Sequence, residues 1–324
     1  MTKIGYSLIC EEHPPQSLLD NAKKAEEAGF QLLSISDHFH PWIPQQGQSP
    51  FVWNILGALS QVTEEIEIGT AVTCPIMRYH PVMVAQAAAT TAKMLEGRFH
   101  FGVGTGEALN ERILGRVWPE AAIRLDLLKE AVEVIRKLWT GESISHRGKY
   151  YTVENATIFT LPEKTPKIVV AASGQKAAKL AGEIGDGLWG LAPDSDLLQT
   201  FEDAGGKDKP KYGQFHVCVA ETEEEARALV HKQWPNGGLT GELNAILPTP
   251  AHFEQACEMV TEDMATKNIV CSRDASAHVD MMKKYAEAGY THVSVHQIGT
   301  DHSYFFDLYK SEVVPEFTRA KVGR

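Results

Sequence analysis

Long apolar runs and basic clusters are both missing from this sequence. No apolar run in the 324 residues is long enough to span a membrane, and the N-terminus begins a strand pattern in place of a signal peptide. The 31 lysines and arginines are outnumbered by 42 aspartates and glutamates and form no basic block. This argues against a nucleic-acid or anionic-membrane partner. We therefore expect a soluble cytoplasmic protein whose net charge of -11 favours solubility.

Cysteine is scarce, and its arrangement argues against a disulfide framework. The cysteines are odd in number and contain no Cys-x-x-Cys pair: Cys10, Cys74, Cys218, Cys257 and Cys271. Such a pattern favours reduced thiols over disulfides or a zinc knuckle. An isolated cysteine such as Cys74 is more often a small buried hydrophobic residue than a reactive group.

A regular alternation of strand and helix patterns runs through the chain. Strand patterns occupy eight segments: 3–10, 31–36, 66–72, 99–103, 167–172, 187–190, 212–220 and 291–296. Apolar residues at helical spacing separate them, for example from Leu18 to a stop at Gly29, and along 125–138. Eight strands with intervening helices are what a closed parallel barrel requires. We predict an α/β protein with a (β/α)8 TIM barrel, as one domain over residues 1–324.

Two segments interrupt this alternation. Residues 141–161 include a predicted hairpin outside the barrel, and residues 234–265 are rich in proline and glycine yet largely helical in pattern. We expect residues 234–265 to help shape a substrate pocket, because insertions before the last barrel strand lie near the catalytic face. Residues 23–30 also reappear in altered form as residues 283–290. Convergent loop chemistry explains this repeat at least as well as duplication does.

Chemical groups are concentrated directly after the second strand pattern. The apolar run 32–35 is followed by Ser36-Asp37-His38-Phe39-His40-Pro41-Trp42. In a parallel barrel, residues just past the C-terminal end of a strand lie where catalysis takes place. The alternative for an isolated Asp-His pair is an ordinary strand-to-loop junction with two solvated histidines.

A second motif, residues 102–110, follows the strand pattern at 99–103 and opens a helix. Its glycines are spaced G-x-G-x-G, and Glu107 stands where a bound pyrophosphate would meet repulsion. The motif is therefore a poor match to a dinucleotide fingerprint. A plain structural helix start is the alternative interpretation.

Together these motifs resemble the coenzyme F420 (deazaflavin) dependent oxidoreductases of the luciferase-like family. This group includes F420-dependent glucose-6-phosphate dehydrogenases and secondary alcohol dehydrogenases, and the resemblance spans nearly the whole chain. It implies a homodimeric enzyme that transfers a hydride between F420 and the carbinol carbon of an alcohol or sugar-type substrate.

The resemblance also implies roles for individual residues. His38 is the better candidate for the base that takes the hydroxyl proton, Trp42 would lie against developing positive charge, and Glu107 would act on the deazaflavin side. The roles of His38 and Glu107 are partly interchangeable. The implied F420 contacts are Asp37, Ala71, Val72, Cys74, Thr105, Gly106, Asn110, Ser173, Gly174, Lys176 and Ala177. A non-proline cis peptide is implied at Ala71–Val72, and a phosphate site is implied at the helix start after residue 172.

The sequence departs from the glucose-6-phosphate enzymes at their substrate-phosphate site. Where those enzymes use cations and a threonine, this chain has Leu191, Asp194, Asn244 and Lys267. An acid in place of a cation would repel a phosphate dianion, so we predict that glucose 6-phosphate is not the specific substrate.

The sequence also allows three other interpretations of the function. A metal-dependent hydrolase could use His38 and His40, with His292 and His296 as further candidates, although no complete ligand set is evident and we predict no metal. An FMN-dependent luciferase-like monooxygenase would share the barrel. A non-catalytic cofactor-binding protein would not need both His38 and Glu107.

Overall fold

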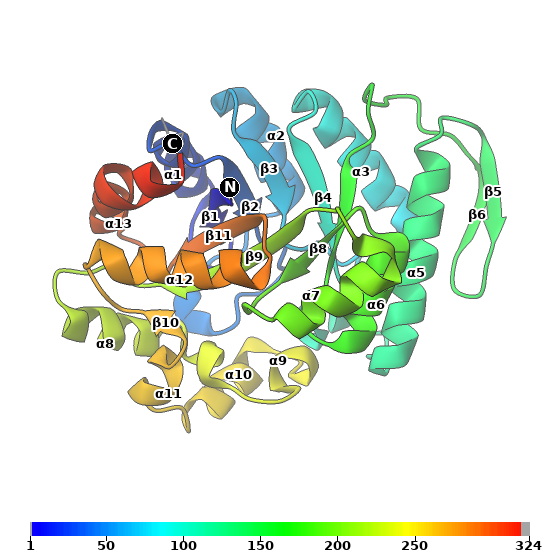
Figure 1. Cartoon of the computed structure of the whole chain (residues 1–324). Helices are drawn as coiled ribbons and strands as arrows, with labels where there is room; N and C mark the ends of the chain where they lie inside the picture. Colours follow the sequence, from blue (N-terminus) through cyan, green and yellow to red (C-terminus); the bar gives the residue numbers. More distant parts are fainter. Residues whose placement is uncertain (1, 319–324) are drawn as a thin grey trace.

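Eight parallel strands form a closed barrel in the computed structural model of the chain, which describes residues 2–318 (Figure 1). Around the barrel the order is β1 (Lys3–Leu8), β2 (Leu32–Ile35), β3 (Glu67–Thr70), β4 (Phe99–Val103), β7 (Lys167–Ala171), β8 (Gly187–Gly190), β9 (Lys211–Val217) and β11 (His292–Gln297), which pairs with β1. This closure confirms the predicted (β/α)8 fold. The short strand β10 (Ile269–Val270), which was not predicted, pairs with the C-terminal end of β9.

Helices surround the barrel and bury one face each against it (Figure 1). The main ones are α1 (Pro15–Glu27), α2 (Val52–Val62), α3 (Pro81–Met94), α5 (Ala121–Leu138), α6 (Gln175–Ile184), α7 (Ser195–Phe201), α8 (Glu223–Gln233) and α12 (Ala275–Ala288). In α1 the buried positions include Leu18, Ala22 and Ala25, as the helical spacing predicts. The described chain ends with α13 (Ser303–Leu308), a π-helical turn at Tyr309–Val313, and α14 (Val314–Thr318).

The two interrupting segments have the secondary structure that their patterns predict. Strands β5 (Ile144–Arg147) and β6 (Thr152–Ala156) form an antiparallel hairpin that projects beyond α5 (Figure 1). Residues 235–266 contain a 3-10 turn at Pro235–Gly238, then α9 (Leu243–Ile246), α10 (Pro250–Cys257) and α11 (Glu262–Thr266).

Shorter elements complete the connections between strands and helices. A 3-10 turn at Pro44–Gln46 lies between β2 and α2, and α4 (Ala108–Glu111) with a 3-10 turn at Arg112–Leu114 follows β4. A π-helical turn at Glu202–Gly206 extends α7.

The repeated segment gives two matching helix ends. Gly29 after α1 and Gly289 after α12 both have positive φ, 89° and 109°. In each case the next residue's N–H donates to a carbonyl five residues back, from Phe30 to Ala25 and from Tyr290 to Tyr285. Glycine is favoured at this position because a side chain would strain the left-handed conformation. The two copies of the repeat therefore form the same glycine-terminated helix end, and each is followed by a barrel strand.

Aromatic rings fill the N-terminal end of the barrel interior. The Tyr212 ring stacks on His100 at a centroid distance of 4.8 Å and on His292 at 4.4 Å. Gly69 is required beside them, because a Cβ atom there would lie 1.8 Å from Nε2 of His100. His292 is the first residue of β11, whereas His38 follows the C-terminal end of β2, so the two histidines lie at opposite ends of the barrel. His292 therefore cannot join His38 at one metal.

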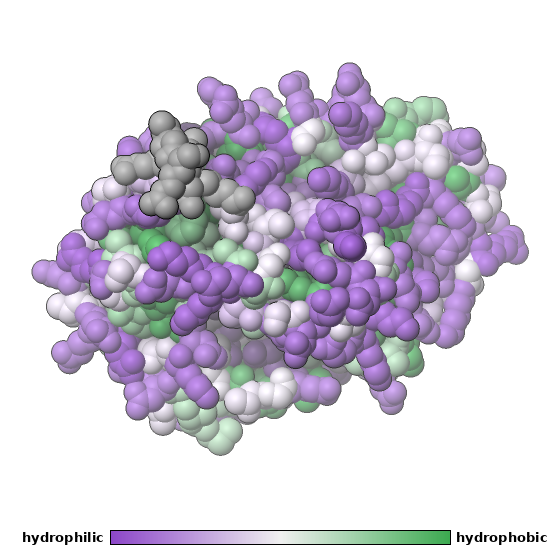
Figure 2. Space-filling view, viewed as in Figure 1, coloured by the Kyte–Doolittle hydropathy of each residue, from purple (hydrophilic) through white to green (hydrophobic). Residues whose placement is uncertain are grey.

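The described helices are all too short or too polar to cross a membrane. On the face shown in Figure 2, polar side chains predominate and apolar residues form small, scattered patches. The cysteines are all free thiols, as predicted.

Candidate active site

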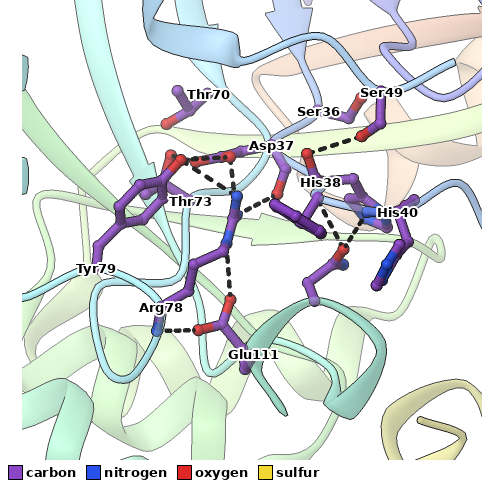
Figure 3. Close-up of polar contacts among 12 residues, drawn as sticks. Ser36, Asp37, His38, His40, Ser49, Thr70, Thr73, Arg78, Tyr79 and Glu111 are labelled. Carbon is purple, nitrogen blue, oxygen red and sulfur yellow. Dashed lines mark hydrogen bonds and ion pairs between the residues drawn. The ribbon is translucent and has the colours of Figure 1, made fainter. Parts of the chain in front are cut away.

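The candidate residues gather at the C-terminal ends of β2, β3 and β4. A buried ionic network ties these three strand ends together (Figure 3). The carboxylate of Asp37 accepts hydrogen bonds from Thr73 Oγ1 at 2.8 Å, Arg78 Nη2 at 2.8 Å and Tyr79 OH at 3.1 Å. Its side chain has no exposed surface. Asp37 therefore acts inside the protein, fixing the segments on which other candidates stand.

Arg78 also pairs with Glu111, a residue that sequence reasoning missed. The Arg78 backbone N–H donates to Glu111 Oε2 at 2.7 Å, and Nε lies 3.4 Å from Oε1 (Figure 3). Burial raises the pKa of Glu111 to about 7, although Arg78 opposes the shift. The guanidinium lies 4.4 Å from the centre of the Tyr79 ring. One buried cation thus serves two buried carboxyl groups.

Cys74 and Gly106 are packed against each other beside this network. Cys74 is 4% exposed, and burial raises the pKa of its thiol well above the usual value. Gly106 has φ of 68°, and a Cβ atom on it would lie 2.5 Å from Cys74 Sγ. The thiol is therefore a packing group at this position.

Asn110 joins the segments of the two predicted acid–base residues. Its Oδ1 accepts from the backbone N–H groups of Phe39 at 2.9 Å and His40 at 3.2 Å. These two donors fix the amide orientation, so that Nδ2 donates to Glu107 Oε2 at 3.3 Å. Asn110 is 1% exposed. Asn110 thus bridges the backbone of residues 39–40 and the side chain of Glu107, an arrangement that we call the Asn110 clamp.

His38 is held by a carboxylate from the loop after β1. Its Nδ1 lies 3.3 Å from Glu11 Oε1 and 3.2 Å from the carbonyl oxygen of His40. Glu11 is itself buried and accepts a hydrogen bond from Ser36 Oγ. Its position directly after a buried strand is the same signal that identified residues 36–42, so sequence reasoning could have found it.

Trp42 and His40 flank His38 in different ways. The Trp42 ring lies 4.9 Å from the His38 ring and 5.1 Å from Phe253 of α10. His40 turns away, because its Nδ1 contacts the carbonyl oxygen of Leu109 at 3.0 Å. Among the described residues, no group of three or more His, Cys, Asp or Glu side chains could hold a metal ion. The geometry therefore gives no support to a metal site at His38 and His40.

The predicted cofactor contacts lie along the ends of β3, β4 and β7. The Ala71–Val72 peptide is cis, as the resemblance implies, and both residues are partly buried. Thr105 and Gly106 are also partly exposed in the loop after β4. At the β7 end, Ser173 and the N-cap residue Gly174 precede α6, and Lys176 and Ala177 lie in its first turn. Ser173, Gly174 and Lys176 are exposed, Ala177 is partly buried, and the helix has no side-chain cap.

The four predicted substrate residues are dispersed over three segments. Leu191 is 60% exposed after β8, and the nearby Asp194 caps α7 by accepting from the N–H groups of Asp196 and Leu197. Asn244 lies in α9, where its Oδ1 is buried without a partner, and Lys267 follows α11. Within the described residues, none of these four side chains hydrogen-bonds another. The capping role of Asp194 was not foreseen, although Asp three residues before an apolar position is a helix-start signal.

Comparison with known proteins places this architecture in a family. A model described as luciferase-like monooxygenase matches residues 2–292. The chain belongs to the luciferase-like family. This luciferase-like protein is 36% identical to a protein named F420-dependent glucose-6-phosphate dehydrogenase from Microbacterium testaceum strain StLB037, over 98% of each chain.

Solved structures show the same likeness. The luciferase-like barrel matches an F420-dependent secondary alcohol dehydrogenase in complex with an F420-acetone adduct, with a TM-score of 0.89 and 32% identity over 97% of this chain and 98% of that one. A type II Baeyer-Villiger monooxygenase component from Pseudomonas putida, in complex with FMN, shares the fold at a TM-score of 0.70 and 17% identity over 97% and 98%. The barrel alone therefore does not select between F420 and FMN.

Proposed function

We propose that the protein is an F420-dependent dehydrogenase that transfers a hydride between coenzyme F420 and the carbinol carbon of an alcohol or sugar-type substrate. The observation that carries this proposal is the Asn110 clamp. It binds the loop that bears His38 and, through its Nδ2, the carboxylate of Glu107 at 3.3 Å. Two acid–base groups are thereby fixed at one end of the barrel. The 36% identity to a named F420-dependent dehydrogenase over almost the full chain supports this cofactor.

The residues at the strand ends fit the cofactor. The exposed first turn of α6 offers uncapped backbone N–H groups, and Lys176 adds a positive charge, which suits a phosphate. Ala71, Val72, Thr105 and Gly106 would lie against the ring system, while Cys74 supports Gly106 from behind. When bound, F420 would supply the carbon that exchanges the hydride. We assign Asp37 and Asn110 to holding this surface in place.

His38 can act as the base in its observed hydrogen bonding. Nδ1 faces a carboxylate oxygen of Glu11 and the carbonyl oxygen of His40, and neither of these can donate a hydrogen bond when Glu11 is ionised. Nδ1 must then carry the ring proton of neutral His38, which leaves Nε2 with a free lone pair. A substrate hydroxyl can pass its proton to Nε2, and Trp42 lies against the resulting imidazolium. Glu107 would serve the cofactor side.

The substrate is an uncharged alcohol or sugar in this proposal. Asp194 stands where the glucose-6-phosphate enzymes have a cation, and its carboxylate already caps α7. Leu191 adds an exposed apolar surface beside it. A phosphate dianion beside the Asp194 carboxylate would meet electrostatic repulsion.

Cofactor titration tests the proposal directly. F420 and FMN would each be titrated into purified protein, followed by turnover assays with alcohols and free sugars. We expect F420 to bind much more tightly than FMN, and F420 reduction to depend on an alcohol. Selective FMN binding with oxygen consumption would instead establish the monooxygenase reading.

We further propose a cytoplasmic homodimer made of one barrel domain. Free thiols throughout the described chain support a reducing compartment. Sedimentation or light scattering at micromolar concentration gives the oligomeric state, and a mass of twice 35.7 kDa is expected. A monomer would contradict the dimer without affecting the proposed chemistry.

A further inference from the structure

Three side chains form a continuous hydrogen-bonded chain that the proposed mechanism does not use. It runs from Glu12 in the loop after β1, through His296 of β11, to His216 of β9. Glu12 Oε2 lies 3.1 Å from His296 Nε2, and His296 Nδ1 lies 2.8 Å from His216 Nδ1. Glu12 is 2% exposed and His296 has no exposed surface, whereas His216 keeps part of its surface accessible. The chain therefore has a buried end and an accessible end.

The accessible end lies at the same end of the barrel as His38, because His216 is near the C-terminal end of β9 and His38 follows the C-terminal end of β2. Tyr212 and His216 lie four residues apart on β9, so they share one face of the strand, and Tyr212 stacks inside the barrel on His100. His216 therefore points inward near the C-terminal end of β9. The Trp234 ring lies 5.7 Å from His216 and 4.6 Å from His296. Trp42, the neighbour of His38, packs against the same apolar cluster as Trp234.

The two imidazoles can share only one proton across their short contact. If Glu12 is ionised, His296 donates from Nε2 and accepts at Nδ1, so His216 carries its proton on Nδ1 and its Nε2 is bare. If Glu12 is protonated, it donates to His296 Nε2, His296 donates from Nδ1, and His216 carries its proton on Nε2. Going from the first state to the second, His216 takes up one proton at Nε2 and passes its Nδ1 proton to His296 Nδ1. His296 in turn passes its Nε2 proton to the Glu12 carboxylate, which becomes a carboxyl group.

We propose that Glu12, His296 and His216 form a proton relay that makes His216 Nε2 a hydrogen-bond donor to a second oxygen of the substrate whenever Glu12 is protonated. The substrate class is thereby narrowed to alcohols with a neighbouring oxygen, such as diols and sugars. This role rests on the proposed dehydrogenase function, but the relay itself does not. His216 is a specificity-determining residue here, and Glu12 and His296 are positioning residues.

The surroundings of Glu12 favour its protonated form at neutral pH. Burial raises the pKa of Glu12 to about 8, opposed by His13 and by the Gly299 N–H, which donates to Oε1 at 3.3 Å. Burial lowers the pKa of both His216 and His296 to about 3, so neither imidazole holds a second proton. The other titratable groups around the relay are Glu11, Tyr6, Cys218 and His302.

The relay can be tested on protein without cofactor or substrate. Nitrogen NMR of labelled histidines would follow His216 Nε2 between pH 6 and 10. We expect Nε2 to be protonated at pH 6 and to lose its proton with a midpoint near pH 8, as Glu12 ionises. Glu12→Gln should abolish the transition, because the amide N–H donates to His296 Nε2 at every pH and fixes the donor state.

Tyr6→Phe is the control, since it removes a buried hydrogen bond to a different histidine, the 2.7 Å bond from Tyr6 to His302, and leaves every hydrogen bond of the relay in place. It should leave the His216 transition in place. If Glu12→Gln does not fold, infrared titration of the protonated carboxyl band in the unmodified protein replaces it, and its midpoint must match that of His216. The relay would be overturned if the His216 transition persisted in Glu12→Gln, or if the His216 and carboxyl titrations had different midpoints.

Kinetics test the substrate contact separately. His216→Phe should raise KM about tenfold for vicinal diols or sugars, the cost of one lost hydrogen bond, while KM for simple secondary alcohols changes less than about twofold. An equal rise for both substrate types would remove His216 from substrate recognition. Absence of F420-dependent turnover with every alcohol would refute the proposed function, whereas the NMR result would still decide the relay.

Discussion

At the scale of single residues, the site is organised by carboxylates that hold other groups in place. Glu11 contacts Nδ1 of His38, Asp37 and Glu111 share Arg78, and Asn110 donates a hydrogen bond to Glu107. Position after a strand indicated a site near His38, whereas Glu107 and Asn110 were predicted to belong to it only through the resemblance to F420-dependent enzymes. The sequence could not show that the Asp37 carboxylate is fully engaged by Thr73, Arg78 and Tyr79, since these contacts join residues 36 to 42 positions apart.

Sequence reasoning also missed residues that carry the same signal as those it found. Glu11 and Glu12 follow the strand pattern at residues 3–10 as directly as Asp37 follows the one at 31–36, yet consecutive acids are common on solvated surfaces. His292 and His296 looked equivalent in sequence, but four residues along a strand separate the two ends of the barrel. Such distinctions depend on strand register, which only the folded barrel defines.

Removing either proposed acid–base group should affect turnover more than cofactor binding. We expect His38→Ala and Glu107→Gln each to lower kcat by roughly 10²–10⁴-fold, the usual contribution of a positioned acid or base. F420 affinity from fluorescence titration should change little. His40→Ala is the matched control and should be much milder, because His40 turns towards the Leu109 carbonyl. Loss of turnover in His40→Ala but not in His38→Ala would restore the metal-site interpretation.

At the scale of secondary-structure elements, the loops after β2, β3 and β4 behave as one unit because buried charges link them. Arg78 contacts the β2 loop through Asp37 and the start of α4 through Glu111 (Figure 3). The eight-strand pattern predicted these loops as separate connections between strands and helices, and it did not predict the contacts between them. The α6 terminus stands apart from this network, with an exposed first turn after β7.

Breaking the ionic network should destabilise the fold. Arg78→Met leaves two buried carboxyl groups without their cation, and loss of a buried partner costs about 3–5 kcal/mol. Urea denaturation measures the free energy of unfolding. The control is Arg147→Met in the β5–β6 hairpin, whose exposed pair with Glu154 should contribute less than about 1 kcal/mol. Equal losses would show that the Arg78 network is not a major source of stability.

The α6 terminus makes a separate prediction about the cofactor. Lys176→Ala should raise the Kd for F420 about tenfold, as expected for loss of one charge-assisted hydrogen bond. Lys179→Ala is the control, because Lys179 is exposed on the same helix but lies beyond its first turn. Fluorescence titration measures both. Equal effects would indicate a general charge effect and would place the phosphate elsewhere.

At the scale of the whole molecule, buried titratable groups set the dependence of stability on pH. Burial lowers the pKa of five histidines to about 3 or 4: His100, His216, His292, His296 and His302. Burial raises the pKa of two carboxyl groups, Glu12 to about 8 and Glu111 to about 7. The two sets act in opposite directions, since each histidine resists gaining a proton and each carboxyl resists losing one.

Thermal stability should therefore be highest near pH 6.5 and fall on both sides. Below pH 6.5 the unfolded histidines bind protons that the folded ones reject, so Tm falls as the pH drops towards 4. Above pH 6.5 the folded carboxyls still hold protons that the unfolded chain has released, so Tm also falls towards pH 8. Calorimetry measures both arms. Glu12→Gln should make the alkaline arm shallower and the acid arm steeper, because Glu12 also offsets part of the histidine effect between pH 4.5 and 6.5. A Tm that rises from pH 6.5 to 8 would contradict the assignment.

The charge of the whole chain also bears on the substrate. With a net charge of -11 and Asp194 beside Leu191, glucose 6-phosphate should be turned over poorly. A panel of alcohols, free sugars and sugar phosphates, assayed by F420 reduction, measures kcat/KM. A kcat/KM for glucose 6-phosphate at least as high as that for every neutral substrate would contradict this prediction. It would show that Asp194 does not stand at the position of the substrate-phosphate site of the glucose-6-phosphate enzymes.

Glu11 and Glu12 are neighbours in the chain, yet one serves His38 and the other serves His296. A single-residue insertion or deletion between Leu8 and Glu12 would withdraw both carboxylates from their histidines at once. Evolution should therefore preserve the length of this stretch. In related chains we expect insertions and deletions in the β5–β6 hairpin and in residues 234–265, and none between residues 8 and 13.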